Sequence, residues 1–300
     1  MEIETLTGLL RELGCAFRTD ARFDALTTFR IGGAIPLLIL PENAETLRVL
    51  LRELNKRGEK CFILGKGSNL LAPDEGVDYP VIQLSEGEFA EVSVDGETVT
   101  AGAGVPLTRL CAAAMEAGLT GLETEYGIPG SVGGGIFMNA GAYGGELCDS
   151  LISVTSVSGA GELVTREKSA LSFSYRHSSF TDNGEVVLRA QFRLKKAPKE
   201  TVRAAMDDYM SRRKEKQPLN FPSAGSAFRR PTGYYAGALI EQAGLKGFSI
   251  GGAQVSEKHA GFIINAGGAT ARDVRALIAH IQQTVYERSG VRLTPEIMAL

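Results

Sequence analysis

Several features that mark whole classes of protein are missing from this sequence. Its 4 cysteines, Cys15, Cys61, Cys111 and Cys148, lie far apart, and no two of them form a CxxC pair. We therefore expect reduced cysteines in a protein core, with no disulfides. The 3 histidines show neither an HExxH pattern nor a cysteine at ligand spacing. No metal is expected.

The sequence also has no excess of charge of one sign and no long hydrophobic run. It has 32 Lys+Arg against 35 Asp+Glu, a net charge of −3, which argues against nucleic acid or a membrane surface as the main partner. No run approaches the roughly 18 apolar residues that a membrane helix needs. The first residues lack the basic start and apolar core of a signal peptide, so we expect a cytoplasmic protein.

The common motifs of hydrolases and nucleotide-binding folds are missing as well. There is no GxSxG and no GxxxxGK[ST], which argues against a nucleophile-elbow hydrolase and a P-loop enzyme. Gly65 and Gly67 are not followed by a third glycine in the GxGxxG register, so a Rossmann fold is poorly supported.

Glycine, in contrast, is abundant, with 36 residues, and much of it is clustered. One cluster, Gly65-Lys66-Gly67-Ser68-Asn69, follows a predicted strand over 61–64, and the segment 127–135 has five glycines in nine residues. Glycine lets backbone N–H groups approach phosphate oxygens, although one such loop alone is equally consistent with a tight turn. The two together favour a diphosphate-binding surface.

The order of predicted elements indicates an α+β protein of about two domains, consistent with 300 residues of which 44% are hydrophobic. Residues 1–20 are expected to form a short amphipathic helix. The pattern then predicts a small β-α-β lobe over about 1–75, whose helix starts at 41–43 and has leucines at helical spacing. It also predicts a larger, mostly antiparallel lobe over 76–198, with a hairpin at Asp95-Gly96 and a strand over 151–157. A smaller α+β domain over 199–300 begins with a helix at 200–216 and closes with a strand at 291–298. This pattern fits a fold in which two lobes hold a flavin nucleotide.

Seven stretches in order along the chain resemble UDP-N-acetylenolpyruvoylglucosamine reductase, the MurB family. They are residues 28–33, 64–71, 127–144, 174–180, 222–228, 236–247 and 293–296. The resemblance implies a two-lobed FAD-binding domain of the vanillyl-alcohol-oxidase (PCMH) type, followed by a substrate domain. It also implies an NADPH-dependent flavoprotein oxidoreductase that reduces an enolpyruvyl ether of UDP-N-acetylglucosamine to UDP-N-acetylmuramate, a peptidoglycan precursor.

The resemblance assigns the glycine clusters to FAD. The expected cofactor-binding residues are Gly65, Lys66, Gly67, Ser68, Asn69, Leu70, Ile128, Pro129, Gly130, Ser131, Gly133, Gly134, Asn139, Ala140 and Gly141. No histidine or cysteine stands in the first glycine loop, where related flavin oxidases carry a covalent link. Non-covalent FAD is therefore expected.

The resemblance also assigns the chemistry, in which hydride passes from flavin N5 to the β-carbon of the enolpyruvyl group. Arg176 and Glu296 are expected to stabilise the resulting enediolate, and Ser226 to protonate the α-carbon. The expected substrate-binding residues are Arg213, Lys216, Arg229 and His259, with Arg230 beside them.

Two other functions remain open on the residues alone. One is a flavin oxidase or dehydrogenase of the same fold that acts on another sugar or alcohol. The other is a nucleotide-sugar sensor without catalysis. Within the family, only 50 residues separate Arg176 from Ser226, which resembles the subclass lacking a tyrosine-bearing loop over the substrate.

Overall fold

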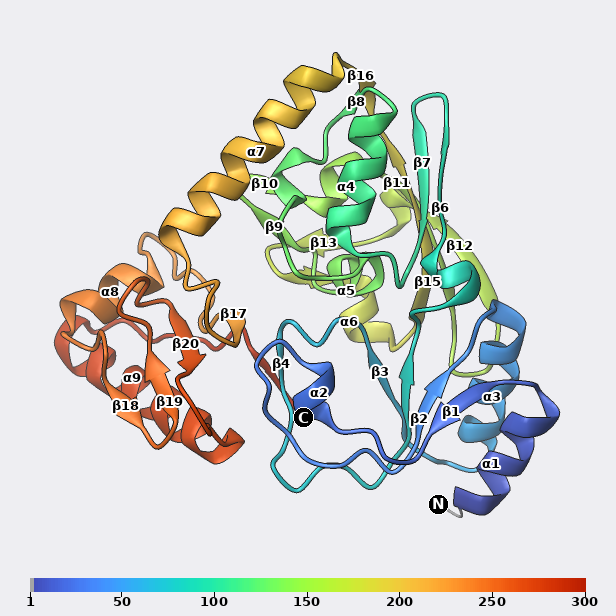
Figure 1. Cartoon of the computed structure of the whole chain (residues 1–300), viewed down its shortest axis with the longest axis horizontal. Helices are drawn as coiled ribbons and strands as arrows, with labels where there is room; N and C mark the ends of the chain where they lie inside the picture. Colours follow the sequence, from blue (N-terminus) through green and yellow to red (C-terminus); the bar gives the residue numbers. More distant parts are fainter. Residues whose placement is uncertain (1–2) are drawn as a thin grey trace. The chain divides into compact units, whose positions relative to one another are not determined.

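The computed structural model describes residues 3–300, which form two compact units (Figure 1). Unit 1 comprises residues up to Thr19 together with Pro36–Lys66 and Tyr79–Ser211. Unit 2 comprises Asp20–Ile35, Gly67–Asp78 and Arg212–Leu300. Each unit is therefore assembled from segments that are distant in the sequence.

The helices are spread over both units. They are α1 Ile3–Glu12, α2 Phe23–Leu26, α3 Ala44–Lys56, α4 Leu107–Glu116, α5 Val132–Phe137, α6 Ser179–Asn183, α7 Lys199–Lys216, α8 Ala236–Gln242 and α9 Ala271–Ser289. None of them is long and apolar enough to cross a membrane, as far as residues 3–300 are concerned.

The strands of unit 1 build a mixed sheet, an antiparallel sheet and small two-stranded sheets. They are β1 Ala16–Arg18, β2 Leu38–Leu40, β3 Phe62–Leu64, β5 Val81–Gln83, β6 Val92–Asp95, β7 Thr98–Gly102, β8 Leu119–Thr120, β9 Gly141–Ala142, β10 Gly145–Glu146, β11 Leu151–Val157, β12 Leu163–Glu167, β13 Phe173–Ser174, β14 His177–Ser178, β15 Val186–Arg193 and β16 Lys195–Lys196. Those of unit 2 are β4 Leu70–Leu71, β17 Ser223–Ser226, β18 Ser249–Ile250, β19 Ala253–Val255, β20 Phe262–Asn265 and β21 Met298–Ala299.

The first sheet of unit 1 has the strand order β1-β2-β5-β3. Strand β5 pairs in parallel with both β2 and β3, while β1 is antiparallel to β2. Helix α3 connects β2 to β3, and its leucines at helical spacing are buried in the same core as α1 (Figure 1). Asn43 begins α3 by accepting a hydrogen bond from the Thr46 N–H. The predicted β-α-β unit is present.

The second sheet of unit 1 has the order β12-β11-β15-β7-β6, and every pair in it is antiparallel. The predicted hairpin near Asp95-Gly96 joins β6 to β7, but Asp95 itself pairs with Thr98, so the turn residues are Gly96 and Glu97. Helices α4 and α5 contribute Leu110 and Ile136 to the core beneath this sheet. The mostly antiparallel lobe is therefore as expected.

Unit 2 contains the antiparallel sheet β17-β20-β19-β18. Helices α8 and α9 pack on one face of it, where Val255 and Ile263 share a core with Leu277. Phe29 and Leu71, from the two early segments of unit 2, are buried in the same core. The α+β fold class is confirmed, and this arrangement is the smaller α+β part.

The compact units differ from the expected division at residues 75 and 198. Strand β5 begins at Val81 yet lies between β2 and β3, so the first sheet extends past residue 75. Residues 20–35 and 67–78 join unit 2 because their apolar side chains are buried with those of α8 and α9. A division into functional domains near residue 198 stays a prediction.

The strand expected over 291–298 and the helix expected over residues 1–20 differ from the structure. The segment 291–298 is not one strand, because its N–H groups donate in turn to different partners: that of Glu296 to Ala227 O and that of Met298 to Asn69 O. Helix α1 ends at Glu12, short of residue 20. Met1 and Glu2, at the start of that expected helix, lie outside the described residues.

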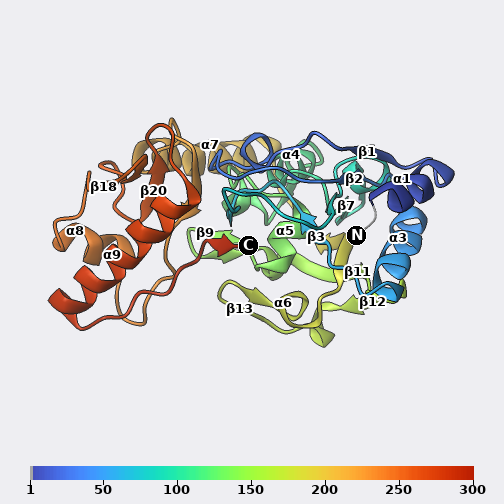
Figure 2. The same cartoon turned by 90° about the horizontal axis from the view of Figure 1, so that it is seen from below.

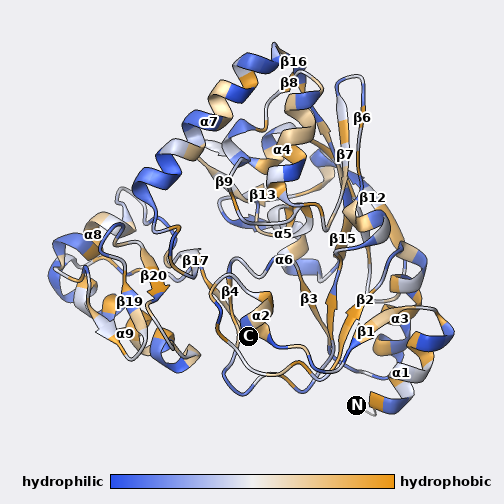
Figure 3. Cartoon of the chain, viewed as in Figure 1, coloured by the Kyte–Doolittle hydropathy of each residue, from blue (hydrophilic) through white to orange (hydrophobic). Residues whose placement is uncertain are grey.

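Helix α7 runs from the last residues of unit 1 into unit 2. Figure 3 shows it as largely hydrophilic, whereas β2 and β3 are hydrophobic. This fits the predicted charged helix at 200–216, which begins one residue earlier, at Lys199.

Candidate active site

Arg176 lies at the tip of a short hairpin in unit 1. Strands β13 and β14 pair Ser174 with His177, which leaves Tyr175 and Arg176 as the turn (Figure 2 shows β13 next to α6). Arg176 has a φ of 56°, in the left-handed region that residues with a side chain rarely adopt. Its Nη1 and Nη2 donate to the carbonyl oxygens of Asn139 at 3.4 Å and Gly141 at 2.7 Å. The guanidinium is therefore held by backbone groups in a defined orientation, as binding of a carboxylate requires.

The second glycine segment contains a helix that the sequence did not predict. Ser131 begins α5, with its Oγ accepting from the Gly134 N–H. The N–H groups of Val132 and Gly133 donate to the carbonyl oxygens of Val105 and Ala103. These donors are used within the protein, so Gly133 and Gly134 do not offer N–H groups to a ligand here. Of the expected cofactor residues in 128–134, Gly130 and Ser131 retain N–H groups without an acceptor in the described chain.

The first glycine loop leaves β3 with Gly65 and continues to Asn69. Gln83 of β5 fixes its start by donating from Nε2 to Gly65 O at 3.1 Å. Among residues 3–300, no acceptor is found for the N–H groups of Lys66, Gly67 and Ser68. Gly67 has a φ of 59°, and consecutive N–H groups around a left-handed residue form concave anion-binding sites. This donor set fits a diphosphate.

The segments that carry Ser226 and Glu296 lie side by side in unit 2. The N–H of Glu296 donates to the carbonyl oxygen of Ala227 at 2.9 Å, one residue from Ser226. Asn69, at the end of the first glycine loop, donates from Nδ2 to Glu296 O at 3.0 Å. The fold thus brings together the segments of two predicted catalytic residues and one predicted cofactor residue. Asn69 and Glu296 are 227 residues apart in the sequence.

A bulge in β17 decides which way Ser226 points. Ser223 pairs with Ile264 and Ser226 with Phe262, so three residue steps in β17 match two in β20. Gly225, with a φ of 75°, supplies the left-handed position. Ser226 therefore shares a sheet face with Ile264, opposite the face that packs on α8 and α9.

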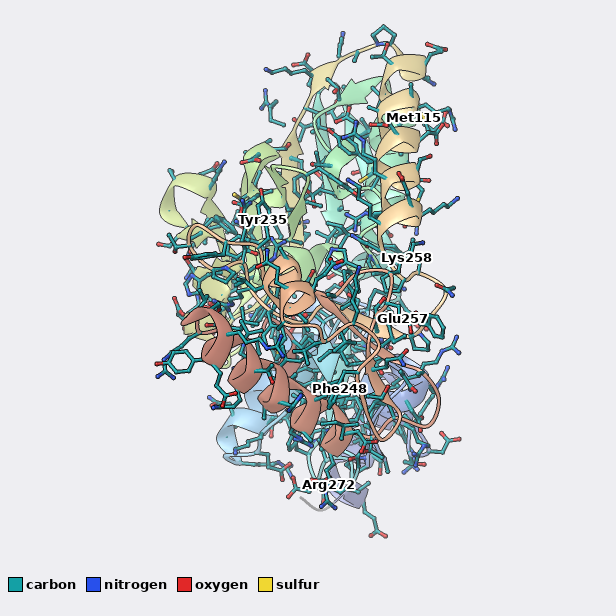
Figure 4. The ribbon with its side chains drawn as sticks, turned by 90° about the vertical axis from the view of Figure 1, so that its left-hand side faces the viewer. Met115, Tyr235, Phe248, Glu257, Lys258 and Arg272 are labelled. Carbon is teal, nitrogen blue, oxygen red and sulfur yellow. The ribbon has the colours of Figure 1, made fainter. Side chains whose placement is uncertain are left out.

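The same sheet face carries a surface cavity of about 690 Å³. It is lined by Lys214, Gln217, Pro218, Leu219, Asn220, Phe221, Gln254, Ser256, Glu257, Lys258 and Ile264. Figure 4 shows Glu257 and Lys258 next to each other, and the Nζ of Lys258 donates to Lys214 O. Two lysines beside apolar side chains suit an anionic ligand that also has an apolar part.

The predicted substrate-binding residues all lie in unit 2, but in different settings. Lys216 and Arg229 are exposed, whereas Arg213 on α7 is 6% exposed. His259 is half-buried, its Nδ1 accepts from the Gly261 N–H, and burial lowers its pKa. His259 is therefore neutral near pH 7. Its hydrogen bond holds Gly261, whose carbonyl oxygen accepts from the Ala227 N–H.

The four cysteines are thiols, all buried or half-buried. Burial raises the pKa of Cys61 to about 11, so it is a poor nucleophile. Within residues 3–300, no group of three or more His, Cys, Asp or Glu side chains is arranged to hold a metal ion.

Comparison with known proteins decides the family. The C-terminal domain of UDP-N-acetylenolpyruvoylglucosamine reductase matches residues 217–300, and an FAD binding domain matches residues 35–166. The reductase of Latilactobacillus sakei subsp. sakei (strain 23K) is 45% identical over 280 residues, covering 93% of this chain and 92% of that protein. The chain belongs to the UDP-N-acetylenolpyruvoylglucosamine reductase family.

Other members of this reductase family agree in sequence and in structure. The reductase of Thermotoga maritima (strain ATCC 43589 / DSM 3109 / JCM 10099 / NBRC 100826 / MSB8) is 46% identical over 272 residues, covering 90% of this chain and 94% of that protein. The crystal structure of the reductase (MurB) from Thermus caldophilus superposes with a TM-score of 0.82 at 35% identity, covering 95% of this chain and 98% of that one. The predicted family and the prediction of an FAD-dependent oxidoreductase are confirmed.

The matched FAD binding domain, residues 35–166, contains the first glycine loop, and the N–H groups of this loop that have no acceptor among residues 3–300 fit a diphosphate such as that of FAD. Sequence reasoning missed Gln83, which fixes this loop, and the two lysines of the cavity. It also missed Thr28, whose Oγ1 donates to Ser223 O at 2.7 Å. Thr28 opens a stretch that carries the family resemblance, and that was the one available signal.

Proposed function

We propose that this protein reduces UDP-N-acetylglucosamine enolpyruvate to UDP-N-acetylmuramate in the cytoplasm, with NADPH as the hydride donor. One relative that carries the reductase name is 45% identical over 280 residues, which cover 93% of the chain. The structural observation that supports the proposal is the hydrogen bond from the Glu296 N–H to Ala227 O, which joins the segment that carries Glu296 to the segment that carries Ser226. A peptidoglycan precursor is the product.

FAD binding falls to the first glycine loop in this proposal. Lys66, Gly67 and Ser68 bind the pyrophosphate through their N–H groups, with Gly130 and Ser131 as further donors. No histidine or cysteine lies in 65–69 to form a covalent link, so the cofactor is held without one. When bound, FAD supplies to the β-carbon of the substrate a hydride that comes from NADPH.

Arg176 and Glu296 stabilise the negative charge that develops on the α-carbon and its carboxylate. Arg176 is already oriented by the carbonyl oxygens of Asn139 and Gly141, so little reorganisation is needed when the charge appears. Glu296 is the second residue proposed to stabilise this charge, as the family resemblance implies.

Ser226 donates the proton to the α-carbon. Its side chain is exposed on the sheet face opposite α8 and α9, where it can reach a ligand. A serine hydroxyl is a weak acid in water, but an enediolate carbon in a site without water is basic enough to take its proton.

The cavity of unit 2 is proposed to take the phosphate-bearing part of the substrate. Lys214 and Lys258 line it, and Ser226 shares its sheet face. Arg213, Lys216 and Arg229 add positive charge to the same unit, and His259 supports the strand that carries Ser226. This assignment makes UDP-sugar binding sensitive to ionic strength.

Separating the two half-reactions tests the proposal. The purified protein should show a flavin absorbance spectrum, lose it when NADPH is added and regain it with the enolpyruvyl substrate. Ser226→Ala should leave reduction by NADPH intact and slow re-oxidation by the substrate about 10²- to 10⁴-fold, since only re-oxidation needs the proton. In D₂O the wild-type product should carry deuterium at the α-carbon.

Ser223→Ala is the matched control, because Ser223 lies in the same strand as Ser226. Its backbone carbonyl, which the substitution retains, accepts the hydrogen bond from Thr28 Oγ1. It should leave both half-reactions near the wild-type rates. Equal slowing of both halves in Ser226→Ala would make Ser226 a structural residue. Re-oxidation by oxygen but not by the enolpyruvyl substrate would instead favour a flavin oxidase.

A further inference from the structure

Asn139, whose carbonyl accepts from Arg176, is itself buried and hydrogen-bonded through both ends of its amide. It is 0% exposed and has a φ of 45°, in the left-handed region that asparagine tolerates better than most residues. Its side chain is fully engaged: Nδ2 donates to Glu146 Oε2 at 2.8 Å and to Ser174 O at 3.1 Å, and Oδ1 accepts from the Cys148 N–H at 3.3 Å. An amide nitrogen has two hydrogens, so none is left for a cofactor.

The two groups that Asn139 binds through Nδ2 belong to the two hairpins that hold Arg176. Ser174 pairs with His177 and thus closes the turn that contains Arg176. Glu146 pairs with Gly141, whose carbonyl accepts from the Nη2 of Arg176. The carbonyl of Asn139 accepts from Nη1 of the same guanidinium.

We propose that Asn139 is a positioning residue for Arg176, clamping both hairpins so that the guanidinium meets the substrate carboxylate in one orientation. This role leaves no amide hydrogen of Asn139 for the cofactor contact that the family resemblance implies, and it rests on the proposed function of Arg176. A displacement of about 1 Å at a catalytic group can cost 10²-fold in rate. Losing the clamp should therefore affect the step that uses Arg176.

Asn139→Gly is the test variant. Glycine adopts the same left-handed backbone and keeps the carbonyl that binds Arg176, while the side-chain clamp is removed. Ser156→Ala is the matched control: Ser156 is also 0% exposed in unit 1, and it hydrogen-bonds Glu185 at the five-stranded sheet. Glu146→Gln retains an oxygen acceptor for Nδ2 and should behave nearly as wild type.

The first measurement needs no turnover. In ¹⁵N-labelled protein, the Nε–H resonance that disappears in Arg176→Ala identifies Arg176. An ordered guanidinium gives a sharp signal protected from water. That signal should broaden or vanish in Asn139→Gly and remain in Ser156→Ala and Glu146→Gln. An unchanged signal in Asn139→Gly would overturn the proposal.

The second measurement is a double-mutant cycle on the two half-reactions. Asn139→Gly should slow re-oxidation by the enolpyruvyl substrate about 10- to 100-fold and leave NADPH reduction within about 2-fold. In the Arg176→Ala background the same change should slow re-oxidation less than about 2-fold, because Asn139 acts through Arg176. The same loss in both backgrounds would overturn the proposal. A wild-type enzyme that the substrate does not re-oxidise would refute the proposed function, and the resonance of Arg176 would still decide the role of Asn139.

Discussion

Arg166 and Glu185 form a two-point ion pair at the five-stranded sheet of unit 1. Nη2 of Arg166 lies 2.7 Å from Oε1 of Glu185, Nη1 bonds to Oε2, and Ser156 Oγ donates to Oε2 at 2.6 Å. The hydrogen bonds from the Arg166 guanidinium hold the pKa of Glu185 below its usual value. The carboxylate therefore contributes stability above the unfolded pKa of about 4.3, and this contribution is lost as pH falls through the lowered folded value.

We predict that Glu185→Gln lowers the free energy of unfolding at pH 7 by about 1.5–3 kcal/mol, the range for hydrogen bonds to charged groups. The difference from wild type should shrink below about pH 4, where the wild-type carboxylate becomes protonated. Urea denaturation at both pH values measures it. Glu45→Gln is the control, because Glu45 is 72% exposed in its pair with Arg48 and such pairs contribute little. A Glu185→Gln deficit that is the same at both pH values would refute the role of charge.

A capping box begins α9, the longest element of unit 2. Thr270 Oγ1 accepts from the Asp273 N–H, and Asp273 Oδ2 accepts from the Thr270 N–H, both at 3.0 Å. The hydrogen bond from the Thr270 N–H lowers the pKa of Asp273. Since Val274, Leu277 and Ile281 of α9 are buried in the core, fraying of this helix exposes apolar surface.

We predict that Thr270→Ala destabilises the protein by about 1 kcal/mol, as loss of an N-cap usually does. Thr284→Ala in the middle of α9 is the matched control, because its hydroxyl bonds only to the His280 carbonyl within the helix. Thermal unfolding should give a lower Tm for Thr270→Ala than for Thr284→Ala. Equal Tm values would mean that the Thr270 hydroxyl is not needed at the start of α9, where the Asp74 carboxylate also accepts from the N–H groups of Ala271 and Arg272.

Each of the two compact units is built from chain segments that are not consecutive in the sequence. Phe29, Ile31 and Leu71 are 0%, 2% and 1% exposed in the core of unit 2, and β21 pairs with β4. A fragment of residues 199–300 lacks all of these partners. Burying an aromatic or aliphatic side chain is worth about 1.5–3 kcal/mol, so three of them amount to much of a typical domain stability.

We predict that the isolated fragment 199–300 does not fold cooperatively. Its amide NMR spectrum should be poorly dispersed, and its denaturation by urea should be broad, whereas the full chain gives a cooperative transition under the same conditions. A well-dispersed spectrum and a sharp transition would show instead that residues 199–300 form an independent domain, as the sequence suggests.

Much of the fold could be read from local pattern. Leucines at helical spacing predicted α3, the Asp95-Gly96 signal predicted the hairpin of β6 and β7, and the strand predicted over 151–157 is β11 at its observed bounds. The family could be read from short stretches in order, and the comparisons confirm it. These features depend on residues within one element or one turn, where spacing alone carries the information.

Long-range packing set the rest. Gly67 illustrates this, because its place in a glycine loop suggested only room for a phosphate. In the structure a Cβ there would lie 2.6 Å from Leu26 O, and the backbone is left-handed, so glycine is required within unit 2 itself. Likewise, nothing near Asn139 in the sequence indicates that Ser174 and Glu146 share its amide.

The bulge of β17 is another feature of the candidate site that local sequence does not predict. The triplet Gly225-Ser226-Ala227 is an ordinary small-residue turn as a string, and only pairing with β20 shows that Ser226 faces away from the α8–α9 core. Hydrogen-bond partners such as Asn69 and Glu296 are 227 residues apart and meet because folding buries the apolar segments between them. Local spacing therefore determines which elements form and to which family the chain belongs. Which side chains meet is decided by burial and by the pairing of distant backbone groups, which no short stretch of sequence encodes.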